Sequence, residues 1–139
     1  MRQRISAAIV VLVTAAGMTG VGVALAGPAS AQASCTSATQ IANSGGYLAD
    51  IPTVGASTGN VNCDLGVGNE GTAVEVLQFA LNQCYGQHLT KDGIYGSLTE
   101  AAVEVAQRDA GIPADGVYGP QTRTHIKWPE FTGGHCYKL

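Results

Sequence analysis

A short motif, Asp-Gly-(Ile/Val)-Tyr-Gly, occurs twice in the chain, at residues 92–96 and 115–119. The pair Asp-Gly favours a tight turn, because Gly tolerates a positive φ and Asp can bond the backbone that follows it. Each copy precedes a segment with helical features, so each is predicted to be a compact loop that leads into a helix. Two copies with matching flanks indicate an internal duplication.

Three segments have the features of short helices: 72–85, 97–111 and 120–127. Their apolar residues recur at helical spacing, and a Gly follows or ends each of the first two. Ser/Thr-x-x-Glu patterns at the starts of these two predict capping boxes. The third segment begins with Pro120, which is well tolerated at the first position of a helix.

The first two helical segments also repeat each other in sequence. Ala-Val-Glu-Val-Leu-Gln at 73–78 returns as Ala-Val-Glu-Val-Ala-Gln at 102–107, with five of six residues identical. Part of this match could arise by chance, because amphipathic helices often reuse Ala, Val and Glu. The Gln at the same place in both segments is less easily explained by chance. The predicted fold class is therefore all-α, a small three-helix bundle built from a duplicated helix-plus-loop unit.

The N-terminus has the layout of a secretory signal peptide. A basic start with Arg2 and Arg4 precedes an almost wholly apolar run, and residues 29–31 (Ala-Ser-Ala) form a small-x-small cleavage site, with a second possible cut after Ala33. An uncleaved membrane anchor is the alternative, since the run approaches the ~20 residues that span a bilayer. Its glycines and the cleavage site favour removal of residues 1–31 and an extracellular or cell-wall-associated protein with no membrane attachment.

The charge of the chain limits the partners that it can hold by bulk electrostatics. Loss of Arg2 and Arg4 lowers the 7 basic residues to 5 against 10 acidic ones, a net charge of about −5. An acidic surface repels phosphate backbones, so nucleic acid is not an expected partner. We expect a monomer.

Four cysteines remain after residue 31, and an even count in a small exported chain indicates two disulfides. Three pairings are possible. The preferred one joins Cys35 to Cys63 and Cys84 to Cys136, so that one bridge holds the N-terminal arm and the other holds the C-terminal tail.

The mature chain is predicted to divide into an irregular arm, residues 32–64, and a three-helix domain with a C-terminal tail, residues 65–139. The arm is rich in Ser, Thr, Gly, Ala and Asn, a composition that is equally typical of a disordered linker. Its cysteines favour partial order.

The motifs at 71–78, 92–107 and 111–122 closely resemble the bacterial peptidoglycan-binding domain of the three-helix type, over about residues 65–128. That family occurs as an accessory module beside cell-wall hydrolases. The resemblance implies a three-helix fold and binding of peptidoglycan, through its glycan or its stem peptide. The segments beside the module are too short for a catalytic domain, which predicts a non-catalytic secreted binding module. The alternative is a secreted interaction or inhibitor protein that binds a cell-wall enzyme.

Candidate ligand-binding residues lie in and beside the two loops: Tyr95, Tyr118, Asp92, Asp115, Gln107 and Arg108. The tyrosines offer aromatic faces and hydroxyls for sugars or peptide, or else they pack against the helix ends. The aspartates are equally explained as turn formers, and Gln107 as a cap for the loop backbone. Arg108 has the bidentate fork that suits carboxylates, although a solvated surface cation is the simpler interpretation.

No cofactor or metal is expected. His88, His125, His135 and Cys136 have no recognised ligand spacing, and Cys136 is assigned to a disulfide. No motif supports a catalytic triad of nucleophile, His and Asp. A small helical bundle also lacks the deep cleft that raises a carboxyl pKa for glycan hydrolysis. The chain is therefore predicted not to be an enzyme.

Overall fold

The computed structural model of the chain describes residues 32–132 and 134–139. The predicted signal peptide, residues 1–31, lies outside the described residues, and so does the alternative membrane anchor. Within the described residues, no helix has both the length and the apolar character that a membrane crossing requires.

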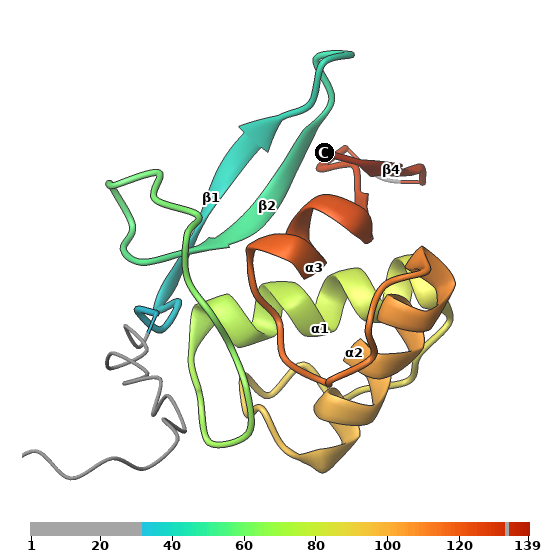
Figure 1. The fold of residues 1–139 in the computed structure, drawn as a ribbon. Helices are drawn as coiled ribbons and strands as arrows, with labels where there is room; N and C mark the ends of the chain where they lie inside the picture. The colour runs from blue at the N-terminus through green and yellow to red at the C-terminus, as the bar shows by residue number, and fades with distance from the viewer. Residues whose placement is uncertain (1–31, 133) are drawn as a thin grey trace, which may run out of the picture.

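An antiparallel hairpin replaces most of the irregular arm that was predicted for residues 32–64. Its strands are β1 (Ser37–Ala42) and β2 (Leu48–Thr53), paired in register along their whole length (Figure 1). The prediction of an irregular arm was wrong for this part of the chain.

The hairpin combines a weak apolar alternation in its second strand with a well-defined turn between the two strands. Ala49, Ile51 and Thr53 lie on one face of β2 and are fully buried, which fits the two-residue period of a strand, and Pro52 between them is buried as well. Oδ1 of Asn43 accepts the backbone N–H of Gly45 at 2.9 Å and closes the turn. The buried residues are few and mostly small, so they do not stand out in the sequence.

The three helices are α1 (Thr72–Tyr85), α2 (Ser97–Ala110) and α3 (Pro120–His125), close to the predicted ranges. The predicted capping boxes do not form. Gly71 and Gly96 occupy the N-cap positions without any side-chain hydrogen bond, because the Thr and Ser of the two patterns are already the first helical residues.

The C-terminal tail is also ordered, as a second small sheet. Strand β3 (Lys127–Pro129) pairs antiparallel with β4 (Cys136–Lys138). Trp128 on β3 is fully buried, and its Nε1 donates to the carbonyl of Arg123 at 2.9 Å. This strand brings the single Trp of the chain into the core.

The fold is therefore three helices with two two-stranded antiparallel sheets, and the prediction of an all-α three-helix bundle was wrong. The physical reason is the size of α3, which has 6 residues and buries one of them, Thr122. So short a helix cannot cover the apolar face of α1. In Figure 1 α1 lies at the centre, and it packs against β1, β2, β3 and α2.

Two disulfides fasten the added sheets to the helical part. Cys35 bonds to Cys63, with an S–S distance of 2.04 Å, and Cys84 bonds to Cys136 at 1.97 Å. The preferred pairing is confirmed. The first bridge joins the start of the hairpin to the segment before α1, and the second joins α1 to β4.

Candidate binding site

The first loop is fixed by the buried side chain of Gln78 on α1, which is 2% exposed. Oε1 of Gln78 accepts the backbone N–H of Gly93 at 3.0 Å. Its Nε2 lies 3.0 Å from Oδ1 of Asp92 and 3.1 Å from the carbonyl oxygen of Ile94. The hydroxyl of Thr99, at 3.2 Å from Nε2, completes the set. One amide group therefore holds the loop and the first turn of α2 together.

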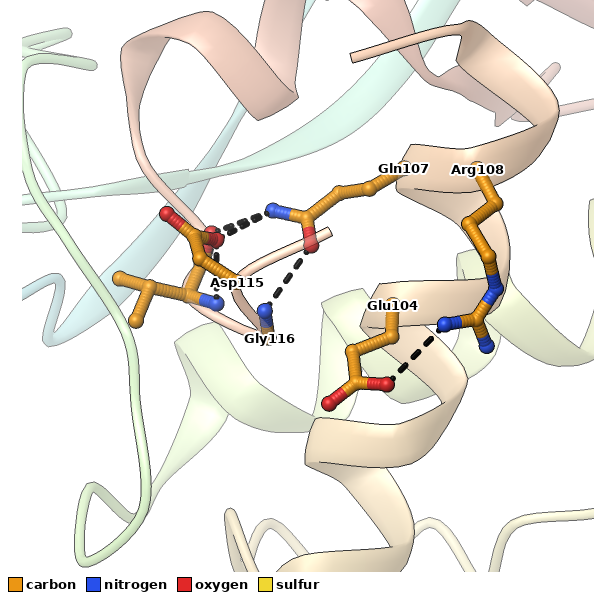
Figure 2. Close-up of polar contacts among 6 residues, drawn as sticks. Glu104, Gln107, Arg108, Asp115 and Gly116 are labelled. Carbon is orange, nitrogen blue, oxygen red and sulfur yellow. Dashed lines mark hydrogen bonds and ion pairs between the residues drawn. The ribbon is translucent and has the colours of Figure 1, made fainter. Parts of the chain in front are cut away.

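The second loop repeats this arrangement around Gln107 on α2, which is 1% exposed (Figure 2). Oε1 of Gln107 accepts the N–H of Gly116 at 2.9 Å, and Nε2 lies 2.8 Å from Oδ1 of Asp115. The carbonyl of Val117 at 2.9 Å and the hydroxyl of Thr122 at 3.0 Å fill the same places as in the first loop. The duplication seen in the sequence is thus a duplication of one hydrogen-bond network, which we call the glutamine clamp.

The aspartates of the motif form the turns that were predicted for them. Oδ1 of Asp92 accepts the N–H of Ile94, and Oδ1 of Asp115 accepts that of Val117, both at 2.9 Å. The hydrogen bond from Gln78 lowers the pKa of Asp92, so its carboxyl group is anionic at neutral pH. Both carboxylates are exposed and reach solvent. A ligand contact through them stays a prediction.

The two tyrosines of the motif lie inside the molecule. Tyr95 is 1% exposed and Tyr118 is fully buried, so neither ring has an accessible face for a sugar. Their backbones pair with the segment before α1: Tyr95 N–H donates to Asn69 at 2.9 Å, and Tyr118 N–H donates to Leu65, also at 2.9 Å. The packing interpretation describes both residues in this structure.

The tyrosine hydroxyls differ between the two loops. The hydroxyl of Tyr95 donates to the carbonyl of Gly116 at 2.7 Å and so ties the first loop to the second. The hydroxyl of Tyr118 is buried without a hydrogen-bond partner, and its ring meets Trp128 edge-on at 5.9 Å between centroids. Burial raises the pKa of both hydroxyl groups.

Arg108 is not brought to the loops. Figure 2 shows its side chain on a different side of α2 from that of Gln107, which reaches the loop at Asp115. Its Nη1 lies 3.1 Å from Oε2 of Glu104, and the two side chains are 57% and 37% exposed. This is an ordinary surface ion pair at i, i+4 spacing. A ligand role for Arg108 stays a prediction that this geometry does not favour.

A shallow groove of about 230 Å³ opens between the first loop and the start of α2. Its polar lining includes the Asp92 carboxylate and the hydroxyl groups of Thr90 and Ser97. Its apolar lining includes Ile94 and Leu98, which are 55% and 77% exposed. Exposed aliphatic side chains beside hydrogen-bonding groups suit a ligand with both apolar and polar faces. We call this the first-loop groove.

Reasoning from the sequence missed Ile94 and Leu98. Ile94 and its counterpart Val117 (42% exposed), the residues after Asp-Gly, both face solvent. The missed signal is the alternation within each loop: the buried Gly and Tyr lie on either side of the exposed aliphatic residue, as in a short strand.

No metal site is found in the part of the chain that the structure describes, where no three His, Cys, Asp or Glu side chains converge. Cys136 is in a disulfide, and Nδ1 of His125 lies 2.8 Å from the carbonyl of Gln121 on its own helix.

Replacing Gln107 by Met tests the glutamine clamp. The change keeps the length of the side chain but leaves the buried N–H of Gly116 without an acceptor, which costs about 1–3 kcal/mol, with further loss from the other bonds. We expect the free energy of unfolding to fall by about 3 kcal/mol, measured by urea denaturation with Trp128 fluorescence. Gln121→Met, at an exposed site on α3, is the control, with an expected change within about 0.5 kcal/mol. Equal stability of the two variants would contradict the clamp.

Phe substitutions separate the two tyrosines. Tyr95→Phe removes the bond to Gly116 and should cost about 1 kcal/mol at neutral pH. Tyr118→Phe removes a buried hydroxyl group without a partner and should be neutral or stabilising. The same urea titrations measure both, and the reverse order of stability would contradict the hydrogen bonding described above.

These two substitutions also predict a dependence on pH. An unfolded tyrosine ionises near pH 10, whereas the raised pKa of the buried groups keeps them protonated in the folded protein. Above about pH 10 the unfolded state therefore binds fewer protons, and stability falls as pH rises. Each Phe variant should lose stability less steeply above pH 10 than the parent. A slope that neither variant changes would contradict the burial of these groups.

Comparison with known proteins assigns the helical part to a family. Residues 70–126 match the family model described as "Putative peptidoglycan binding domain". No curated protein matches the chain significantly. A solved structure, a peptidoglycan-binding protein from Clostridioides difficile in complex with glutamine hydroxamate, is 29% identical, with 61% of this chain and 53% of that one covered and a TM-score of 0.47. The chain thus spans about half the length of that protein, and the assignment rests on the sequence match. Residues 70–126 are therefore similar in sequence to the peptidoglycan-binding domain family.

Proposed function

We propose that this protein is an exported, non-catalytic module that binds bacterial cell-wall peptidoglycan. The observation that carries the proposal is the family match over residues 70–126, which includes both glutamine clamps. The two disulfides support a location outside the cytoplasm, because such bonds persist in oxidising compartments.

The first-loop groove is the proposed contact with peptidoglycan. The Asp92 carboxylate and the hydroxyl groups of Thr90 and Ser97 can exchange hydrogen bonds with sugar hydroxyls or peptide amides. Ile94 and Leu98 can cover the C–H face of a sugar ring or an aliphatic stem residue. The groove is shallow, so we expect weak binding at a single site. The many binding sites of an insoluble wall should raise the overall retention through multivalency.

The chemistry of this groove supports binding without hydrolysis. Cleavage of a glycosidic bond needs a carboxylic acid with a raised pKa to protonate the leaving oxygen. Asp92 is the carboxyl group among the residues that line the groove, and its pKa is lowered by the bond from Gln78. It is ionised at neutral pH and cannot serve as that acid.

Co-sedimentation with purified sacculi tests this proposal. Protein produced from the full-length chain, with both disulfides formed, should pellet with the sacculi. Leu98→Ser should weaken retention about fivefold, the equivalent of roughly 1 kcal/mol of lost apolar contact. Ile94→Ser should act in the same direction.

The duplication supplies a matched control. Val117 is the counterpart of Ile94 in the second loop and is also exposed, so Val117→Ser makes a similar change outside the groove. It should retain the binding of the parent. Parent protein that stays in the supernatant would overturn the proposed function and favour a protein partner. Equal retention of the Ile94 and Val117 variants would overturn the proposed site.

A further inference from the structure

A second and larger groove, of about 460 Å³, lies beside α1, where the two sheets meet the helical part. We call it the hairpin groove. Asp50 on β2 and Phe131, which follows β3, both line it and both lie outside residues 70–126. The backbone N–H of Phe131 donates to the carbonyl of Leu48 at 2.7 Å, which fixes this side of the groove to the hairpin. The groove thus exists because this chain adds two sheets to the family domain.

The remaining lining comes from α1 and the first loop. Phe79 on α1 is 38% exposed and Phe131 is 60% exposed, so two aromatic rings border the groove. Nζ of Lys91 lies 5.0 Å from the centroid of the Phe79 ring, a cation–π distance. This contact places the ammonium group in the lining of the groove.

The charges of the hairpin groove are not neutralised by one another. Asp50 and Glu75 supply two carboxylates and Lys91 supplies one ammonium group. Over the described residues, the ion pairs within 4.0 Å are Arg108 with Glu104 and Lys127 with Asp109, so none of these three groups takes part in one. Unpaired charges of both signs along one groove fit a ligand that carries both signs itself.

We propose that the hairpin groove binds a short peptide with a free side-chain amine and a terminal carboxylate, the chemistry of a peptidoglycan stem peptide. Asp50 and Glu75 receive the ligand amine, Lys91 meets its carboxylate, and the two Phe rings cover its aliphatic part. This inference rests on the proposed function, and it names the stem peptide, not the glycan, as the part of peptidoglycan that this groove binds. A neutral glycan carries no charge that could pair with these three groups, and a polyphosphate would be repelled by the two carboxylates.

Titration calorimetry with three soluble probes tests the inference. The probes are the tripeptide L-Ala-γ-D-Glu-L-Lys, the same peptide acetylated on its side-chain amine, and peptide-free oligomers of N-acetylglucosamine. The free peptide should bind, acetylation should weaken binding about tenfold, and the glycan oligomers should not compete. Equal binding of the free and acetylated peptides, or competition by the glycan oligomers, would overturn the inference.

Charge-removing variants locate the binding. Asp50→Asn and Lys91→Gln should each weaken the tripeptide about tenfold, whereas Asp109→Asn, an exposed carboxylate on α2, should leave its Kd unchanged. An Asp50→Asn variant that binds as well as the Asp109→Asn control would overturn the site.

Sacculus co-sedimentation distinguishes this inference from the proposed function. Parent protein that pellets with sacculi but does not bind the tripeptide would overturn the inference and leave the proposed function standing. Protein that binds the tripeptide but stays in the supernatant would overturn the proposed function alone.

Discussion

Each half of the duplicated unit depends on a single buried amide. Gln78 and Gln107 accept the buried N–H of Gly93 and Gly116, which would otherwise have no partner. Each amide also donates to a backbone carbonyl of its loop, that of Ile94 or Val117. An unpaired buried donor costs about 1–3 kcal/mol, so these bonds are expensive to lose. Asp suits the motif because its carboxylate completes this network, and Gly suits it because φ is +70° at Gly93 and +69° at Gly116. A Cβ at Gly116 would also lie 2.7 Å from Cγ of Glu100. The motif and the helix Gln are therefore one structural device, separated in sequence and joined in space.

This device also explains how the loops reach the rest of the fold. Tyr95 and Tyr118 each pair their backbone with the segment before α1, and the Tyr95 hydroxyl reaches the second loop at Gly116. Because the loop backbones are held at these points, their aliphatic side chains can face solvent while the loops stay ordered. That is how the first loop presents Ile94 beside Leu98 on a rigid surface.

The duplication does not extend to the exposed residue at the start of the following helix. Leu98 at the start of α2 corresponds to Gln121 at the start of α3, so the two loops share a frame but present different chemistry. The hairpin and the second sheet add a further surface that neither repeat contains, with Asp50 and Phe131 beside α1.

The sequence could predict the helices and the turns because their signals are local. Helical spacing and terminal glycines placed α1 and α2 within a residue or so, and Asp-Gly identified both turns. The hairpin was missed because its buried strand residues, such as Ala49 and Thr53, are small or polar and carry little periodic signal. The role of the tyrosines could not be decided from sequence, because an aromatic residue beside a turn suits either a ligand or a core. Only packing shows that Trp128 and the segment before α1 enclose Tyr118.

Amide hydrogen exchange of Gly93 and Gly116 tests the central claim most directly, since both N–H groups donate to the clamping glutamines. The account predicts that both glycines exchange slowly, with protection close to that of the core amides of α1, although both lie in loops. Exchange of either glycine as fast as the exposed turn around Gly46 would contradict it.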